Sequence, residues 1–125
     1  MTNMKHKITV APPNSMFFIS DKSAEVLPEI DRRSVSLWWT RSCIVTGCLM
    51  FADGETELIV SSSTEDAPDT EPAFDGILDT PRQVVEISTS ERQVILRCDV
   101  GGNFTRVRIW RDHPTEPEHI LIVLA

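Results

Sequence analysis

The sequence predicts an all-β fold, a single domain over residues 1–125 in which two antiparallel sheets pack as a β-sandwich of about eight to nine short strands. Apolar and β-branched residues occur in short runs between turn residues, and no segment keeps the helical i, i+3, i+4, i+7 spacing for three full turns. A hydrophobic content of 41% in 125 residues is enough for one core. A closed barrel is the alternative architecture, whereas a parallel sheet would need crossover helices that the pattern lacks.

Nine segments have the composition of strands. They are rich in β-branched, aliphatic and aromatic residues and are bounded by Gly, Pro, Asn, Asp or Ser. In chain order, we expect strands at residues 6–11, 15–20, 34–39, 43–51, 56–61, 83–88, 93–100, 105–111 and 119–124. All eight prolines lie outside these segments, as expected for a residue that has no amide donor.

Three short turn sequences separate consecutive strands. Asp53-Gly54 predicts a hairpin, because the central residues of a type I′ turn need positive φ. Residues 101–103, Gly-Gly-Asn, predict a second hairpin for the same reason, and residues 89–91, Thr-Ser-Glu, predict a third.

Alternation within the strands indicates that each sheet has one buried and one wet face. In segment 56–61, Leu58 and Val60 are expected to point into the core. In segment 93–100 the expected inward residues are Val94, Leu96, Cys98 and Val100.

Two long connections interrupt the strand pattern. Residues 21–33 are interpreted as a loop, because Pro28 interrupts the only short helical pattern there. Residues 61–81 contain three prolines and only Phe74, Ile77 and Leu78 as apolar anchors. This second connection can add a short edge strand in its later half, and loops of such length in compact domains are often functional.

The second connection is strongly one-sided in charge. Between residues 65 and 79 it has no Lys or Arg but six carboxylates: Glu65, Asp66, Asp69, Glu71, Asp75 and Asp79. Such a run repels itself unless a cation or a basic partner lies opposite. Its spacing does not match a calcium-binding D-x-D-x-D-G loop. A basic partner is therefore one reading, and a merely solvated loop is the other.

The chain has residue types that could bind zinc or form a Cys/His nucleophile. They are Cys43, Cys48, Cys98, His6, His113 and His119, but no C-x-x-C pair exists. Cys43 and Cys48 are five residues apart, which in a strand places them on opposite faces. Buried thiols acting as small hydrophobes are the favoured interpretation. No hydrolase or phosphate-loop motif is present, so we expect no catalytic residue, metal or cofactor.

The strand at residues 105–111 offers a second lead. If Val107 and Ile109 face the core, then Arg106, Arg108 and Trp110 share the opposite face. Trp and Arg dominate interface hot spots, so these three residues are candidate partner-binding residues. The alternative is that a loop covers Trp110 and that the arginines pair with the abundant acids.

Net charge restricts the class of partner. A formal charge of −7 disfavours nucleic acids and anionic membranes and favours basic proteins. No apolar window approaches the roughly 18 residues of a membrane span. Three cysteines, an odd number, suit a reducing compartment, so we expect a soluble, cytoplasmic protein.

The order of several segments resembles a known family. The runs "NSMFFISD", "SVSLWWTRSC", "CLMFADGETELIV", "GNFTRVRIW" and "EHILIVLA" are similar in layout to the competence J family of small bacterial β-sandwiches. Members of that family include an inhibitor of a DNA-entry nuclease. The resemblance implies an inhibitory, partner-binding role without assigning any inhibitory residue, and the same role suits small acidic immunity proteins.

The leading hypothesis is a non-catalytic inhibitor or immunity-type protein whose acidic second connection, residues 61–81, covers a basic nuclease or toxin. One alternative is a ligand-binding or enzymatic sandwich with a pocket between the sheets and His113 or His119 as its polar group. Another is a homodimer that pairs through an exposed edge strand such as residues 119–124.

Overall fold

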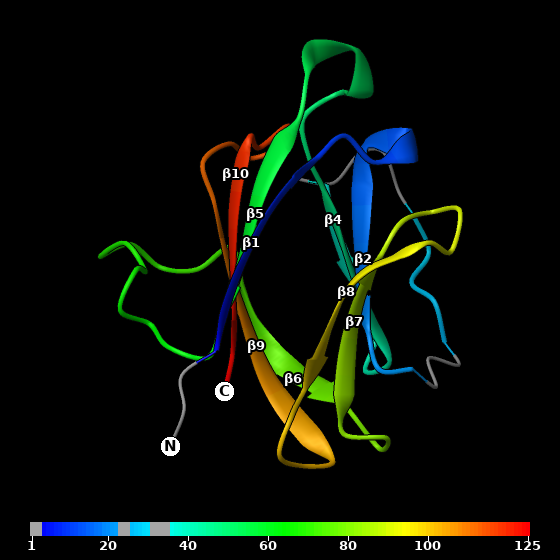
Figure 1. Ribbon diagram of the computed structural model, residues 1–125, viewed down its shortest axis with the longest axis vertical. Coiled ribbons are helices and arrows are strands. Elements are labelled where there is room, and N and C mark those ends of the chain that lie inside the picture. Colours follow the sequence, from blue (N-terminus) through cyan, green and yellow to red (C-terminus); the bar gives the residue numbers. More distant parts are fainter. Residues whose placement is uncertain (1–3, 23–25, 31–35) are drawn as a thin grey trace.

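The computed structural model describes residues 4–22, 26–30 and 36–125, which form a two-layer β-sandwich (Figure 1). Its ten strands are β1 Lys5–Val10, β2 Met16–Ser20, β3 Leu37–Trp39, β4 Cys43–Gly47, β5 Thr56–Ser61, β6 Phe74–Asp79, β7 Val84–Ser88, β8 Val94–Asp99, β9 Phe104–Arg111 and β10 His119–Leu124. Two short 3-10 turns, Pro13–Ser15 and Phe51–Asp53, are the helical segments of the described residues. The predicted all-β sandwich is therefore confirmed.

The strands form two separate five-stranded sheets rather than a closed barrel. Sheet A has the order β1-β5-β10-β9-β6, and sheet B has the order β3-β4-β2-β7-β8. Neighbouring strands are antiparallel except for β5 and β10, which pair in parallel. The two layers face each other, and the connection between β5 and β6 stands on the outer side of sheet A (Figure 1).

The position of β10 corrects one expectation. Residues 119–124 are not an edge strand, because β10 pairs with β5 on one side and with β9 on the other. A homodimer through this strand is excluded, since its backbone donors and acceptors are already used within sheet A.

Two of the three predicted hairpins are wrong. The chain leaves sheet B at Gly47 and enters sheet A at Thr56, so Asp53-Gly54 lies in a connection between the sheets. Gly54 does need glycine, since its φ is 124°, but the strands on either side do not pair. Residues 101–103 likewise connect β8 of sheet B to β9 of sheet A. The turn at residues 89–91 does close a hairpin, between β7 and β8.

The core lies between the sheets and follows the predicted alternation closely. Leu58, Val60, Val107 and Ile109 are fully buried in one cluster contributed by both sheets. Val94 is the exception: it is exposed, because a register shift between Ile87 and Ser88 in the β7–β8 pair changes the alternation at the start of β8.

Strand β6 is the edge strand that the later half of the second connection was expected to add. It pairs antiparallel with β9, and Phe74 and Leu78 bury their side chains in the core. The Phe74 ring lies over Gly76, where a Cβ atom would be 2.8 Å from Cζ of Phe74. Trp39 packs edge-on against the same ring at a centroid distance of 5.2 Å.

The first long connection is described only in part. Val26, Leu27 and Ile30 are exposed, while the predicted start of the third strand at Ser34 lies outside the described residues. Among the residues that are described, no helix has the length and hydropathy of a membrane span.

Candidate functional site

The outer face of sheet A has an unexpectedly apolar row. Leu121 on β10 is paired with Trp110 on β9 and with Ile59 on β5, so the three side chains lie next to one another across the strands. Trp110 and Leu121 are each only 9% exposed. We call these three residues the apolar row. The outer face of sheet A, which was expected to be solvent-exposed, is therefore covered here by the β5–β6 connection.

Residues 62–73, which we call the acidic loop, are held against this face by hydrogen bonds and packing. At its start, the Ser62 N–H donates to the Met4 carbonyl oxygen at 2.9 Å. In its middle, Trp110 Nε1 donates to the Thr70 carbonyl oxygen at 2.9 Å. Ala67 packs against the outer cluster that Trp110 forms with its neighbours. Trp110 thus connects the loop to the sheet by both apolar contact and a hydrogen bond.

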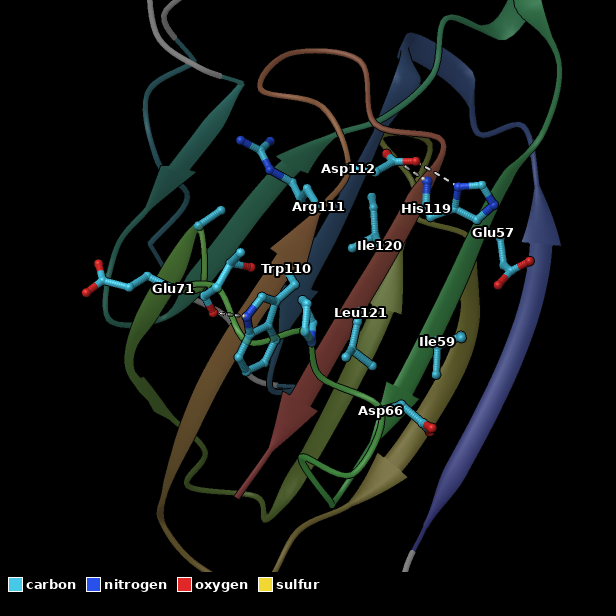
Figure 2. Close-up of a pocket in the computed structure, with 13 residues that line it drawn as sticks. Glu57, Ile59, Asp66, Glu71, Trp110, Arg111, Asp112, His119, Ile120 and Leu121 are labelled. Atoms are coloured by element: carbon cyan, nitrogen blue, oxygen red, sulfur yellow. Dashed lines mark hydrogen bonds and ion pairs between the residues drawn. The ribbon is translucent and has the colours of Figure 1, made fainter.

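A groove of about 470 Å³ lies between the acidic loop and sheet A (Figure 2). The apolar row lies at its centre, with Glu71 at the Trp110 end and Glu57 and Asp66 at the Ile59 end (Figure 2). We call this feature the outer groove. It combines an apolar floor with carboxylates at both ends.

A polar row lies two residues along the strands from the apolar row, on the same outer face. It consists of Asp112, His119 and Glu57, of which His119 and Glu57 are register partners on β10 and β5. His119 Nδ1 is 2.7 Å from Asp112 Oδ2, and Asp112 Oδ1 accepts the backbone N–H groups of Glu118 and His119 at 2.9 and 3.1 Å. Asp112 therefore fixes the orientation of the imidazole.

These contacts change the acidity of both partners. The hydrogen bond to Asp112 is the main cause that raises the pKa of His119 above its ordinary value of 6.5, and the charges of Asp112, Glu57 and Glu118 act in the same direction. Burial alone would raise the pKa of the Asp112 carboxyl. The hydrogen bonds from His119 and Glu118 outweigh that effect and hold the Asp112 pKa below its ordinary value.

Arg111 lines the groove but directs its charge elsewhere. Its Nη1 donates to the Ser36 carbonyl oxygen and to Ser36 Oγ at 3.0 Å each, and its Nη2 donates to the Pro114 carbonyl oxygen at 3.1 Å. The guanidinium points away from the apolar row (Figure 2). Arg111 therefore connects β9 to neighbouring segments rather than neutralising the groove.

The six predicted carboxylates have two different environments. Asp66 is paired with Lys5 at 2.7 Å, Asp79 with Arg41 at 2.8 Å, and Asp75 with Arg106 through two hydrogen bonds of 2.9 and 2.8 Å. Glu65, Asp69 and Glu71 are exposed and have no ion pair within the part of the chain that the structure describes. Half of the predicted charge cluster is thus compensated by the protein itself.

The predicted Arg106, Arg108 and Trp110 do share the outer face of β9, but their surroundings differ. Arg106 is exposed and paired with Asp75. Arg108 is half-buried, and its Nε has no hydrogen-bond partner among the described residues. Trp110 is covered by the acidic loop, so the alternative reading of this face, a loop over the tryptophan and arginines paired with acids, describes two of the three residues.

The cysteines and the remaining histidines do not form a site. Cys43, Cys48 and Cys98 are free and buried, as the sequence favoured. Burial raises the pKa of Cys43 to about 12 and that of Cys48 to about 11, so both remain protonated thiols at neutral pH. No group of His, Cys, Asp and Glu in the described ranges could hold a metal ion.

His119 also corrects one alternative hypothesis. It lies on the outer face of sheet A, so it cannot be the polar group of a pocket between the sheets. His113 is exposed in the β9–β10 connection, where its Nδ1 accepts the backbone N–H groups of Thr115 and Glu116.

The sequence reasoning missed the groove, although a signal was present. Ile59 is an apolar residue at an outward position of β5. Leu121 and Val123 are likewise apolar at outward positions of β10. Apolar residues on both faces of a strand indicate that both faces are covered. This signal, had it been used, would have indicated a cover over the outer face of sheet A, but it does not identify the acidic loop as that cover.

Comparison with solved structures supports the fold. The chain is similar in structure to ComJ of Bacillus subtilis, an inhibitor of the DNA-degrading activity of NucA, with a TM-score of 0.70 at 8% identity over 99% of this chain and 98% of ComJ. It is also similar to the protein described as crocagin biosynthetic gene J, with a TM-score of 0.55 at 12% identity over 98% of both chains.

No protein-family model and no curated protein sequence matches the chain. The structural similarity to ComJ nevertheless confirms the predicted resemblance to the competence J layout at the level of the fold. At identities this low, the likeness assigns a common architecture and no functional residue.

Proposed function

We propose that the chain is a non-catalytic protein-binding module that inhibits a basic partner, a nuclease or a toxin, by placing its acidic loop over the partner's phosphate-binding surface. The observation that carries this proposal is the exposure of Glu65, Asp69 and Glu71 on one loop without an ion pair in the described residues. A nuclease must present Lys and Arg to phosphates, and clustered carboxylates match that charge.

The fold comparison supports the choice of a nuclease as the class of partner. ComJ inhibits the DNA-degrading activity of NucA, and this chain has the same architecture over nearly its full length. The likeness makes an inhibitory role on this fold physically reasonable, while the charges argue for it from this chain's own residues. A cytoplasmic location would fit the three free cysteines.

The nine candidate residues contribute to this proposal in different ways. Glu65, Asp69 and Glu71 provide the uncompensated charge that steers a basic partner. Asp66, Asp75 and Asp79 have side chains more than a third exposed, so each can exchange its internal cation for one on the partner. Arg106 and Arg108 border this surface on β9, and Trp110 contributes by holding the loop in place.

The direct test is inhibition of an identified partner. The tagged chain would be purified from its native cells, the co-purified protein identified by mass spectrometry, and that protein's DNA- or RNA-degrading activity measured with and without the chain. We expect a partner with a basic surface whose activity is lost at a one-to-one ratio. A partner that is acidic, or whose activity is unchanged in a saturated complex, would contradict the proposal.

A charge variant tests the role of the loop. Changing Glu65→Gln, Asp69→Asn and Glu71→Gln together should slow association with the partner by roughly 3- to 10-fold at low salt and flatten its salt dependence. The matched control is Asp53→Asn, Glu55→Gln and Glu91→Gln, which changes the net charge equally at exposed positions away from the loop. Equal slowing in both variants would show that overall charge, not the loop, steers the partner.

A further inference from the structure

We propose that the outer groove is a recognition pocket for one basic side chain, an arginine or a lysine, that the protein partner inserts. This inference rests on the proposed function and names the chemical group that the partner presents. It concerns the groove beside Trp110 rather than the exposed carboxylates of the loop surface.

The floor of the groove fits the aliphatic part of such a side chain. Trp110, Leu121 and Ile59 lie side by side on three adjacent strands, and with strands about 4.8 Å apart the row extends roughly 10 Å. Lysine and arginine bury their methylene groups on apolar surface while their charged ends stay in polar surroundings. Trp110 and Leu121 are each 9% exposed, so the stem would contact the part of these side chains that the acidic loop leaves open.

Carboxylate residues lie at both ends of the floor. Glu71 lies at the Trp110 end with its carboxylate turned outward, and Glu57 and Asp66 lie at the Ile59 end (Figure 2). Glu71 has no ion pair in the described part of the chain. The Glu57 ion pair with Lys7 is long, at 3.5 Å, and its Lys7 side chain is 60% exposed, so an incoming cation can share that carboxylate.

The charge around the groove selects a cation over an anion. Seven carboxylates line it or lie next to its walls: Glu57, Glu65, Asp66, Asp69, Glu71, Asp112 and Glu118. Four permanent cations, Lys5, Lys7, Arg108 and Arg111, accompany them, and Arg111 directs its guanidinium to Ser36 and Pro114. An anionic ligand would therefore be repelled.

The arrangement of the carboxylates argues against two other occupants. The carboxylates are spread along the groove, and no cluster among the described residues converges on a point where a metal ion could bind. A purely apolar side chain would leave the carboxylates at the ends of the groove unpaired. An extended cation with an apolar stem can contact the apolar floor and also pair with the carboxylates at its ends.

The test uses a small probe and needs no partner. The intact chain would be titrated with N-acetyl-arginine amide, whose only charge is the guanidinium, while the Trp110 indole and Leu121 and Ile59 methyl signals are followed by NMR. We expect saturable shifts confined to these groups, with half-saturation on the order of 1 mM for a probe of this size. N-acetyl-citrulline amide has the same shape without the charge and should bind at least about tenfold more weakly.

Two variants locate the site. Glu71→Gln should weaken binding of the arginine probe by about two- to five-fold, the range for one exposed ion pair. Glu91→Gln lies in the β7–β8 turn of the other sheet and should leave it unchanged. Equal binding of the arginine and citrulline probes, shifts centred away from Trp110, or no saturable shift would each overturn the pocket.

The outcomes for the pocket and for the proposed function can be told apart. If the probe binds as expected but no partner is inhibited, the pocket stands and the inhibitory role fails. If a partner is inhibited while the probe gives no saturable shift at the groove, the inhibitory role stands and the pocket fails.

Discussion

The two halves of the acidic segment both carry carboxylates without Lys or Arg, but the environments of these carboxylates differ. In residues 65–73 the exposed Glu65, Asp69 and Glu71 have no ion pair in the described part of the chain. In residues 74–79 both aspartates are paired with arginines, Asp75 with Arg106 and Asp79 with Arg41. A run of carboxylates in a sequence therefore does not by itself define a negatively charged surface.

Strand pairing is the reason for the Asp75 ion pair, whereas Asp79 reaches Arg41 in the β3–β4 connection. β6 lies beside β9, so its outward-facing Asp75 and Ile77 are register partners of Arg108 and Arg106. Cross-strand neighbours on one face lie close enough for opposite charges to pair. Among the described residues, no strand pairs with the acidic loop, and Asp66 is its one carboxylate with an ion pair, to Lys5 at 2.7 Å. The loop half keeps its charge because no cation of the described residues is aligned with its other carboxylates.

The largest effect on stability is expected when the acidic loop is released from sheet A. Trp110→Ala removes a nearly buried ring together with its hydrogen bond to Thr70, and we expect the free energy of unfolding to fall by about 3 kcal/mol. Urea unfolding at neutral pH measures this loss. Limited proteolysis of the folded variant should then show cleavage within residues 62–73.

The matched control for this prediction is Trp39→Ala. Trp39 is 57% exposed and packs mainly against Phe74, so its loss should lower the free energy of unfolding by only about 1 kcal/mol. Similar losses in the two variants would show that Trp110 does not hold the loop more firmly than an ordinary surface ring.

A smaller effect is expected when one carboxylate is removed from each half of the acidic segment. The hydrogen bond from Arg106 lowers the pKa of Asp75 below its ordinary value of 3.8, with further lowering by the charges of Arg106 and Arg108. Its contribution to stability is therefore present above about pH 4 and is lost as the pH falls through the lower, folded-state pKa.

We expect Asp75→Asn to lower the free energy of unfolding at pH 7 by at most about 1 kcal/mol, because the ion pair is exposed. Asp69→Asn, in the loop half, should leave that free energy unchanged. Chemical unfolding at pH 7 and again at pH 3 checks both variants. A loss in Asp75→Asn that is as large at pH 3 as at pH 7 would count against an ion pair as its cause.

The smallest expected effect is a change in stability with pH that arises from the protonation of His119 beside the outer groove. Because the His119 pKa is raised, its contribution to stability is complete below the unfolded-state pKa near 6.5 and disappears as the pH rises through the folded-state value. NMR titration of the His119 ring should give a midpoint above 6.5. Asp112→Asn should lower that midpoint while its remaining oxygen still accepts the backbone N–H groups of Glu118 and His119.

A second change tests whether the groove is negatively charged. Glu57→Gln should lower the His119 midpoint by a smaller amount than Asp112→Asn, since Glu57 acts on His119 only through its charge. A wild-type midpoint at or below 6.5 would contradict both the Asp112 contact and the negative character of the groove.

Strand positions were largely predictable, whereas strand neighbours were not. Alternation correctly placed Leu58, Val60, Val107 and Ile109 in the core. Asp53-Gly54 has the composition of a hairpin turn but connects two sheets, because both flanking strands bury their apolar faces in the same core from opposite sides. The turn chemistry is local, and the choice of strand partner is not.

The candidate site shows the same division. The acidic segment and the Arg-Trp face of β9 were both recognised from residue type. That the loop lies over Trp110, and that a groove forms there with Leu121 and His119, depends on β10 lying between β5 and β9. A central position for β10 could not be inferred from a segment whose alternation is hidden by apolar residues on both faces.

The sequence alone determined the all-β class, most strand positions, the inward residues and the excess of carboxylates in residues 65–79. These features depend on composition and on the alternation of side chains along a strand, which are properties of neighbouring residues. Tertiary structure decided which carboxylates keep their charge and where a cavity opens. Both depend on contacts between residues far apart in the chain, such as Arg41 with Asp79 and Trp110 with Thr70, and local sequence patterns do not specify such contacts.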